Sequence, residues 1–163
     1  MPKPNLSRRL MALGAAALLI AVDQLFKLLA RNALAPESSR ALLPGVLGLR
    51  YTENTGISFS LLGDSRVAML VVSAITGLAL LAGVVLMLTG KVPGIALIGA
   101  SMILAGGAGN LVDRVFQGYV IDYIEFLFVK FAIFNFADVL IICGVAVVAV
   151  WVLLSERKRP VKP

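Results

Sequence analysis

Two aspartates in the second half of the chain, Asp122 and Asp138, have the type and spacing that suit acid–base catalysis. If their carboxyl groups converge in a medium of low dielectric constant, mutual repulsion strongly raises the pKa of one of them, and the pair shares one proton. The ionised member can then activate a water molecule while the protonated member donates its proton. The alternative is that each carboxylate caps a helix or pairs with Arg114 or Lys130. The spacing alone leaves both interpretations open.

Polar side chains that could position such a pair lie close to it in the sequence. Asn110 and Arg114 are one helical turn apart, which puts an amide and a guanidinium group on one face. Together these two groups are suited to hold a carboxylate or a peptide carbonyl by hydrogen bonds. Asn135 precedes Asp138 by three residues and shares a helical face with it.

Asp113 competes with Asp122 as the partner of Asp138. It lies directly before Arg114 and three residues after Asn110. At that place we expect its carboxylate to be hydrogen-bonded or ion-paired and therefore unable to share a proton. Asp122 lies past Gly118 in an extended stretch that can turn back toward Asp138, and it has no adjacent basic residue, so we expect Asp122 to be the partner.

Asp23 and Lys27 form a second polar pair, inside an apolar segment. They are four residues apart on one helical face, with the acid before the base, which is the favourable order. Ionisable residues at membrane depth are costly and often functional. Two interpretations stay open: a self-neutralising structural pair, or a pair that orients other groups at the outer mouth of the helices.

The composition indicates that these residues belong to a membrane protein. Of the 163 residues, 60% are hydrophobic and 15% are charged, whereas soluble domains carry about 25% charged residues. There is no histidine and one cysteine, Cys143, which excludes Ser-His and Cys-His catalysis and an intrachain disulfide. The net charge of +6 comes mostly from chain ends and loops. We interpret it as charge that flanks membrane segments and not as a surface for nucleic acid.

Four apolar segments approach the ~20 residues that span a bilayer. They run approximately over residues 10–30, 67–89, 92–112 and 134–154. The first could be a cleaved signal peptide, but it is longer than the usual apolar region of about 7–15 residues. We therefore expect a retained helix. The small residues from Gly106 to Gly109 predict close helix packing.

The distribution of Lys and Arg predicts the orientation in the membrane. Basic residues are concentrated in the N-terminal tail, at Lys91 and in the tail 157–163, which we expect to be disordered. By the positive-inside rule both termini should be cytoplasmic and the connections 31–66 and 113–133 should lie outside.

The outer connections carry patterns of their own. Residues 31–66 are too many for a helix–helix turn of about 2–8 residues. Apolar residues alternate on both sides of Asn54-Thr55-Gly56 and predict a hairpin or small sheet at the membrane surface; they are Leu47, Leu49, Tyr51, Ile57, Phe59 and Leu61. The connection 113–133 is amphipathic and rich in aromatic residues, which suit a membrane interface.

With these polar motifs in this order along the chain, the sequence resembles the lipoprotein signal peptidases, also called signal peptidase II, which are bacterial aspartic membrane proteases. The resemblance covers almost the whole chain. It rests on five motifs: Val22-Asp23-Gln24 with Lys27, Asn54-Thr55-Gly56 through Ser60, Gly106 to Asn110 with Asp113-Arg114, Gly118-x-Val120-x-Asp122, and Phe134-Asn135-x-Ala137-Asp138. Departures from the family pattern are confined to Phe26 and Ser58, at positions without a chemical role.

The resemblance implies a mainly α membrane protein that forms a single integral membrane domain over residues 1–163. Four transmembrane helices would carry a small extracytoplasmic β-cradle within residues 31–66 and a short extracytoplasmic helix near Asp122 to Lys130. The implied substrate is a prolipoprotein with a diacylglyceryl-modified cysteine, cut just before that cysteine. The enzyme would use no cofactor and no metal, contact membrane lipid and be inhibited by globomycin-like antibiotics. Its site would face outward from the bacterial cytoplasmic (inner) membrane.

The resemblance also assigns roles to residues. Asp122 and Asp138 would be the catalytic dyad. The substrate-binding or supporting residues would be Asp23, Lys27, Asn54, Gly56, Gly106, Asn110, Asp113, Arg114, Asn135 and Ala137. A four-helix transporter and a non-enzymatic scaffold are the alternatives. The long patterned outer connection disfavours the first, and the paired Asp and Asn sites disfavour the second.

Overall fold

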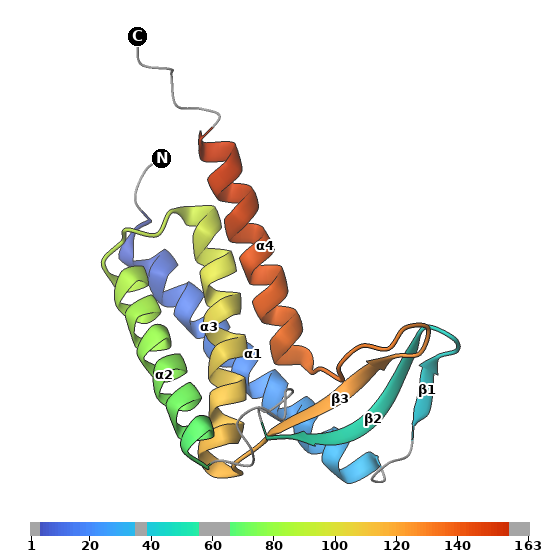
Figure 1. Ribbon diagram of the computed structural model, residues 1–163. Helices are drawn as coiled ribbons and strands as arrows, with labels where there is room; N and C mark the ends of the chain where they lie inside the picture. Colours follow the sequence, from blue (N-terminus) through green and yellow to red (C-terminus); the bar gives the residue numbers. More distant parts are fainter. Residues whose placement is uncertain (1–3, 35–38, 56–65, 157–163) are drawn as a thin grey trace.

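The computed structural model of the chain describes residues 4–34, 39–55 and 66–156 (Figure 1). Three predictions therefore fall outside the described residues. They are the position of Gly56, the strand through Ile57, Phe59 and Leu61, and the state of the tail 157–163.

Four helices form the bundle: α1 (Leu6–Ala33), α2 (Arg66–Leu88), α3 (Gly94–Phe116) and α4 (Phe136–Glu156). Each lies where an apolar segment predicts it and is long and apolar enough to cross a membrane. Large apolar side chains cover the outside of the bundle, and on α2 Met87 is the buried residue. A helix with so little polar surface is stable only in lipid. The chain is a multi-pass membrane protein, as its composition predicts.

Helix α3 is the central element, because α1, α2 and α4 all pack against it (Figure 1). Its close approach to α4 depends on residues without side chains. A Cβ atom added at Gly99 would lie 2.6 Å from the main-chain oxygen of Gly144, and one at Gly106 would collide with the main-chain oxygen of Ala137. The small residues of α3 therefore have the packing role that the sequence predicts.

A three-stranded antiparallel sheet stands beside one end of the bundle. It consists of β1 (Arg40–Leu43), β2 (Leu47–Asn54) and β3 (Val120–Phe126), in the order β1-β2-β3. The alternation of Leu47, Leu49 and Tyr51 thus marks a strand correctly. The sheet is not confined to residues 31–66, because its third strand comes from the connection between α3 and α4.

The short helix implied near Asp122 to Lys130 is wrong for this chain. Residues Val120–Phe126 form β3, and no helix occurs in the described loop that leads on to α4. The segment is rich in β-branched and aromatic residues, which suit a strand. Its main chain pairs with β2 from Leu47↔Phe126 to Asn54↔Val120, so its hydrogen-bonding groups are satisfied in the sheet.

The end of α1 connects the sheet to the bundle. It passes beneath β2 and β3 (Figure 1), and there Ala30 forms a buried cluster with Ile121 and Tyr123 of β3. This contact fixes the inner face of β3 against the helices.

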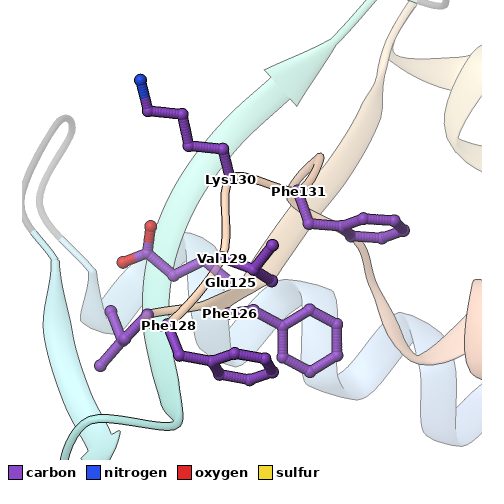
Figure 2. Close-up of a pocket in the computed structure, with 7 residues that line it drawn as sticks. Glu125, Phe126, Phe128, Val129, Lys130 and Phe131 are labelled. Atoms are coloured by element: carbon purple, nitrogen blue, oxygen red, sulfur yellow. The ribbon is translucent and has the colours of Figure 1, made fainter.

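The loop after β3 carries an aromatic cluster at the far end of the sheet. The ring centroid of Phe126 lies 5.5 Å from that of Phe128, 5.8 Å from that of Phe131 and 5.1 Å from that of Phe134. Figure 2 shows the rings of Phe126, Phe128 and Phe131 on one side of the loop and the Lys130 amine on the other. Residues 125–131 enclose a hollow of about 650 Å³. The loop is amphipathic, as the sequence predicts.

Candidate active site

Asp122 and Asp138 come from different elements that meet at one place. Gly118, with a φ of +82°, follows the end of α3 and lets the chain reverse into β3. Asp122 lies in the middle of β3 and is buried, whereas Asp138 lies in the first turn of α4 and is half-buried.

Asn135 joins the two carboxylates. Its side-chain Nδ2 donates to Asp122 Oδ1 at 2.7 Å, and its main-chain N–H donates to Asp138 Oδ2 at 3.1 Å. In return, Asn135 Oδ1 accepts the main-chain N–H of Asp138 at 3.0 Å. One residue thus brings the predicted pair into a single site.

Two further asparagines hold the remaining carboxylate oxygens. Asn54 Nδ2 donates to Asp122 Oδ2 at 2.8 Å, and Asn110 Nδ2 donates to Asp138 Oδ1 at 2.9 Å. All four oxygens of the pair therefore accept a hydrogen bond. Neutral amide donors orient the carboxylates without neutralising them, which leaves their charge available for chemistry.

The surroundings of Asp122 favour its protonated form. Burial is the largest effect and, with the nearby charge of Asp138, raises the pKa of Asp122 to about 6. The hydrogen bonds from Asn54 and Asn135 and the charge of Lys27 act in the opposite direction. Asp122 is therefore suited to hold and deliver a proton near neutral pH.

A buried ion network lies next to the pair. Lys27 Nζ is 2.8 Å from Asp23 Oδ2 and 2.8 Å from Asp113 Oδ2, and these three residues are at most 1% exposed. Lys27 also donates to Asn110 Oδ1 at 2.9 Å. Asp113 is ion-paired, as predicted, which supports Asp122 as the partner of Asp138.

The same network connects the elements that carry the site. Asp23 Oδ1 accepts the main-chain N–H of Ala137 at the start of α4 at 3.0 Å, and Asp113 Oδ2 accepts the main-chain N–H of Ile121 in β3 at 3.2 Å. Of the two interpretations for Asp23 and Lys27, this geometry favours the structural one. Together with Asp113, the pair holds α1, α3, α4 and β3 in place.

Gln24 also belongs to this network, although the motif Val22-Asp23-Gln24 gave it no role of its own. Its Nε2 donates to Asp113 Oδ1 at 3.0 Å and to the main-chain oxygen of Gly109 at 3.2 Å. The available signal was a polar side chain next to Asp23 inside an apolar segment.

Three further predicted site residues of the described chain lie around this centre: Gly106, Arg114 and Ala137. Gly106 and Ala137 lie at the contact of α3 and α4. Arg114 is half-buried, and its Nη1 donates to the main-chain oxygen of Asn110 at 3.3 Å. Asn110 therefore holds a carboxylate as predicted, while Arg114 braces the main chain of its own helix.

Comparison with known proteins identifies the family. The family model described as signal peptidase (SPase) II matches residues 15–154. The chain belongs to the signal peptidase II family. It is an aspartic-type signal peptidase II, as the motifs imply.

Relatives agree with this family assignment, and solved structures agree with the fold. The chain is 36% identical over 141 residues to a lipoprotein signal peptidase of Clostridioides difficile, covering 86% of this chain and 93% of that protein. It is 40% identical over 148 residues to the lipoprotein signal peptidase of Chlorobium phaeobacteroides, covering 83% and 91%. A bacterial membrane enzyme of known structure has a TM-score of 0.78 at 26% identity, covering 88% of this chain and 92% of that one. A second has a TM-score of 0.76 at 23% identity and supports the fold.

Proposed function

We propose that this signal peptidase II cleaves prolipoproteins just before a diacylglyceryl-modified cysteine, using water activated between Asp122 and Asp138. The observation that carries the proposal is the double attachment of Asn135 to both carboxylates. This attachment supports the proposal, because it holds the two carboxyl groups that we propose as proton donor and base at one site.

The proposed roles follow from the environment of each carboxylate. Asp138 lies in the first turn of α4, where the helix N-terminus stabilises negative charge, and it receives two N–H donors. It is therefore the base. Asp122 is buried with a raised pKa of about 6 and is the acid.

In the proposed reaction, Asp138 takes a proton from water as the water oxygen bonds to the scissile carbonyl carbon. Asp122 gives its proton to the carbonyl oxygen, forming a tetrahedral diol. The C–N bond then breaks. Asp138 delivers its proton to the leaving amine, and the diol returns one proton to Asp122 as the new carboxyl group forms. The pair ends in its starting state.

The position of the pair suits a lipid-anchored substrate. Asp122 lies in the sheet beside the bundle, and Asp138 lies at the bundle end nearest the sheet (Figure 1). A scissile bond at the level of the lipid headgroups can therefore reach both carboxylates while the diacylglyceryl chains remain in the bilayer. The amphipathic loop of Figure 2 is suited to rest in the same interface.

We also propose that both termini are cytoplasmic and that the site lies on the extracytoplasmic face of the bacterial inner membrane. The basic residues near the start of α1 and at the α2–α3 turn support this orientation. A periplasmic reporter should be inactive after Pro163 and active at Ser38. The reverse result would invert the topology.

The function is tested with purified protein in lipid and a synthetic prolipoprotein peptide, with or without the diacylglyceryl group. Mass spectrometry of the products locates the cut. We expect cleavage before the modified cysteine, inhibition by globomycin and at least tenfold slower cleavage of the unmodified peptide. Asp138→Asn should be inactive, and the exposed Glu53→Gln should match the unsubstituted enzyme. Cleavage elsewhere, or full activity of Asp138→Asn, would refute the proposal.

A further inference from the structure

A groove runs along α3 at the end of the bundle opposite the dyad. Helices α2 and α4 both pack on α3, but no Cα atoms of their described residues lie within 8 Å of each other. Between them lies an apolar cavity of about 430 Å³, within the usual size of ligand sites. Small residues, Ala96 and Ala100, form part of its floor, while Leu80 of α2 and Trp151 of α4 line its sides.

The mouth of this groove carries positive charge. Lys91, in the turn between α2 and α3, is exposed and is the charged residue among those that line the groove. The guanidinium group of Arg9 lies nearby, where Nη1 donates to the main-chain oxygen of Leu88 at 2.8 Å. The groove thus combines an apolar body with a cationic mouth.

The length of the groove matches one leaflet of a bilayer. Its floor follows α3 from Pro93 to Leu104, about 16 Å at the helical rise per residue. Half of a hydrocarbon core is about 15 Å thick. Lys91 therefore stands at headgroup level when the floor lies along an acyl chain. Trp151, in the last turns of α4, lies where tryptophan is enriched in membrane proteins.

We propose that this groove is a binding site for an anionic phospholipid, with its phosphate at Lys91 and an acyl chain on the floor of α3. Basic pockets between transmembrane helices recognise such headgroups. The apolar helix of a signal peptide is a poorer match, because its positively charged N-terminal region would meet Lys91. The proposal is independent of the roles given to Asp122 and Asp138.

Trp151 provides the test, because it is the single tryptophan of the chain. The full-length protein is reconstituted in phosphatidylcholine vesicles with increasing fractions of a lipid brominated on its acyl chains, which quenches tryptophan fluorescence on contact. We expect brominated phosphatidylglycerol to quench Trp151 at a severalfold lower mole fraction than brominated phosphatidylcholine. Lys91→Gln should bring the two curves together, and Lys91→Arg should keep them apart.

A matched control removes one charge from the same end of the bundle. Arg8 is exposed near the start of α1 and does not line the groove, so Arg8→Gln should keep the separation of the curves. Ala100→Leu, which fills the floor, should weaken quenching by the anionic lipid without removing Lys91. Circular dichroism and the emission maximum of Trp151 verify that each variant is folded.

Three results would overturn the proposal. Identical curves for the two lipids in the unsubstituted protein would mean ordinary exchange with surrounding lipid. An unchanged separation in folded Lys91→Gln would exclude Lys91 as the recognition group. Protection of Trp151 from both lipids, as a second copy or another helix seated in the groove would give, would exclude a lipid as its occupant.

Discussion

Asn135 and Asp138 cap the first turn of α4 reciprocally: Asn135 Oδ1 accepts the N–H of Asp138, and Asp138 Oδ2 accepts the N–H of Asn135. This is the arrangement of a capping box, with an aspartate in the usual place of glutamate. A carboxylate of the proposed dyad is thus part of the device that begins its helix. The same bonds that start α4 also fix the orientation of the proposed base.

This double role predicts that stability and activity can be separated at Asn135. Asn135→Ala removes the cap and the donor to Asp122, so it should cost about 1 kcal/mol of stability and most of the turnover. Asn135→Ser keeps a capping oxygen but is too short to reach Asp122. It should restore the melting temperature and leave turnover low. Thermal unfolding in detergent and cleavage rates measure the two effects, and a Ser variant with normal turnover would contradict the bridging role.

The raised pKa of Asp122 predicts a decline of activity toward alkaline pH. If Asp122 must be protonated, kcat/KM should fall as the pH rises through about 6. Asn54→Ala removes a hydrogen bond that favours the charged form, so the pKa should rise and the alkaline limb should move to higher pH. Glu53→Gln, on the neighbouring exposed residue, should leave the limb in place. A shift of the alkaline limb to lower pH in Asn54→Ala would contradict the role of Asp122 as the acid.

The contact of Arg114 predicts that a change at this residue affects turnover. Its planar guanidinium group donates to the main-chain oxygen of Asn110 and lies beside the site. Lysine keeps the charge but lacks the planar fork. Arg114→Lys should therefore reduce turnover severalfold, while the substitution Arg50→Lys at an exposed side chain of β2 should not. Normal turnover in Arg114→Lys would mean that only the positive charge at this position matters.

The features that the sequence predicts correctly are those set by residues close together in the chain. The four helices follow from continuous apolar segments, and the burial of Asp23 with Lys27 follows from their spacing on one helix. The pairing of β3 with β2 was missed because β2 lies about 70 residues earlier, as in the pair Thr52↔Asp122. No local pattern reports a pairing of that kind.

The sequence also does not predict the direction in which a side chain points, and this direction decides its hydrogen-bond partner. Spacing places Asn110 and Arg114 on one face, yet the amide of Asn110 bonds to Asp138 while Arg114 bonds to the main chain. The packing of α4 against α3 decides which of the two side chains reaches Asp138. The role of Gln24 was missed for a similar reason, because its partners Asp113 and Gly109 lie on another helix.

The last prediction separates Asp122 from Asp113. Both carboxylates are buried, but Asp113 is tied to Lys27, Gln24 and the main chain of Ile121. Breaking a buried ion pair costs about 3–5 kcal/mol. Asp113→Asn should therefore lower the yield of folded protein and keep part of the activity per folded molecule. Lys27 retains Asp23 as its partner in that variant.

Asp122→Asn should behave in the opposite way. It removes the proton donor, but the amide can still accept a hydrogen bond from Asn54 or Asn135, so the fold should persist. We expect no measurable cleavage from this variant or from Asp138→Asn, with globomycin binding retained in both. Turnover normalised to folded protein decides between the two aspartates. An active Asp122→Asn beside a folded but inactive Asp113→Asn would transfer the role of acid to Asp113, because a folded variant that has lost the proton donor cannot complete cleavage.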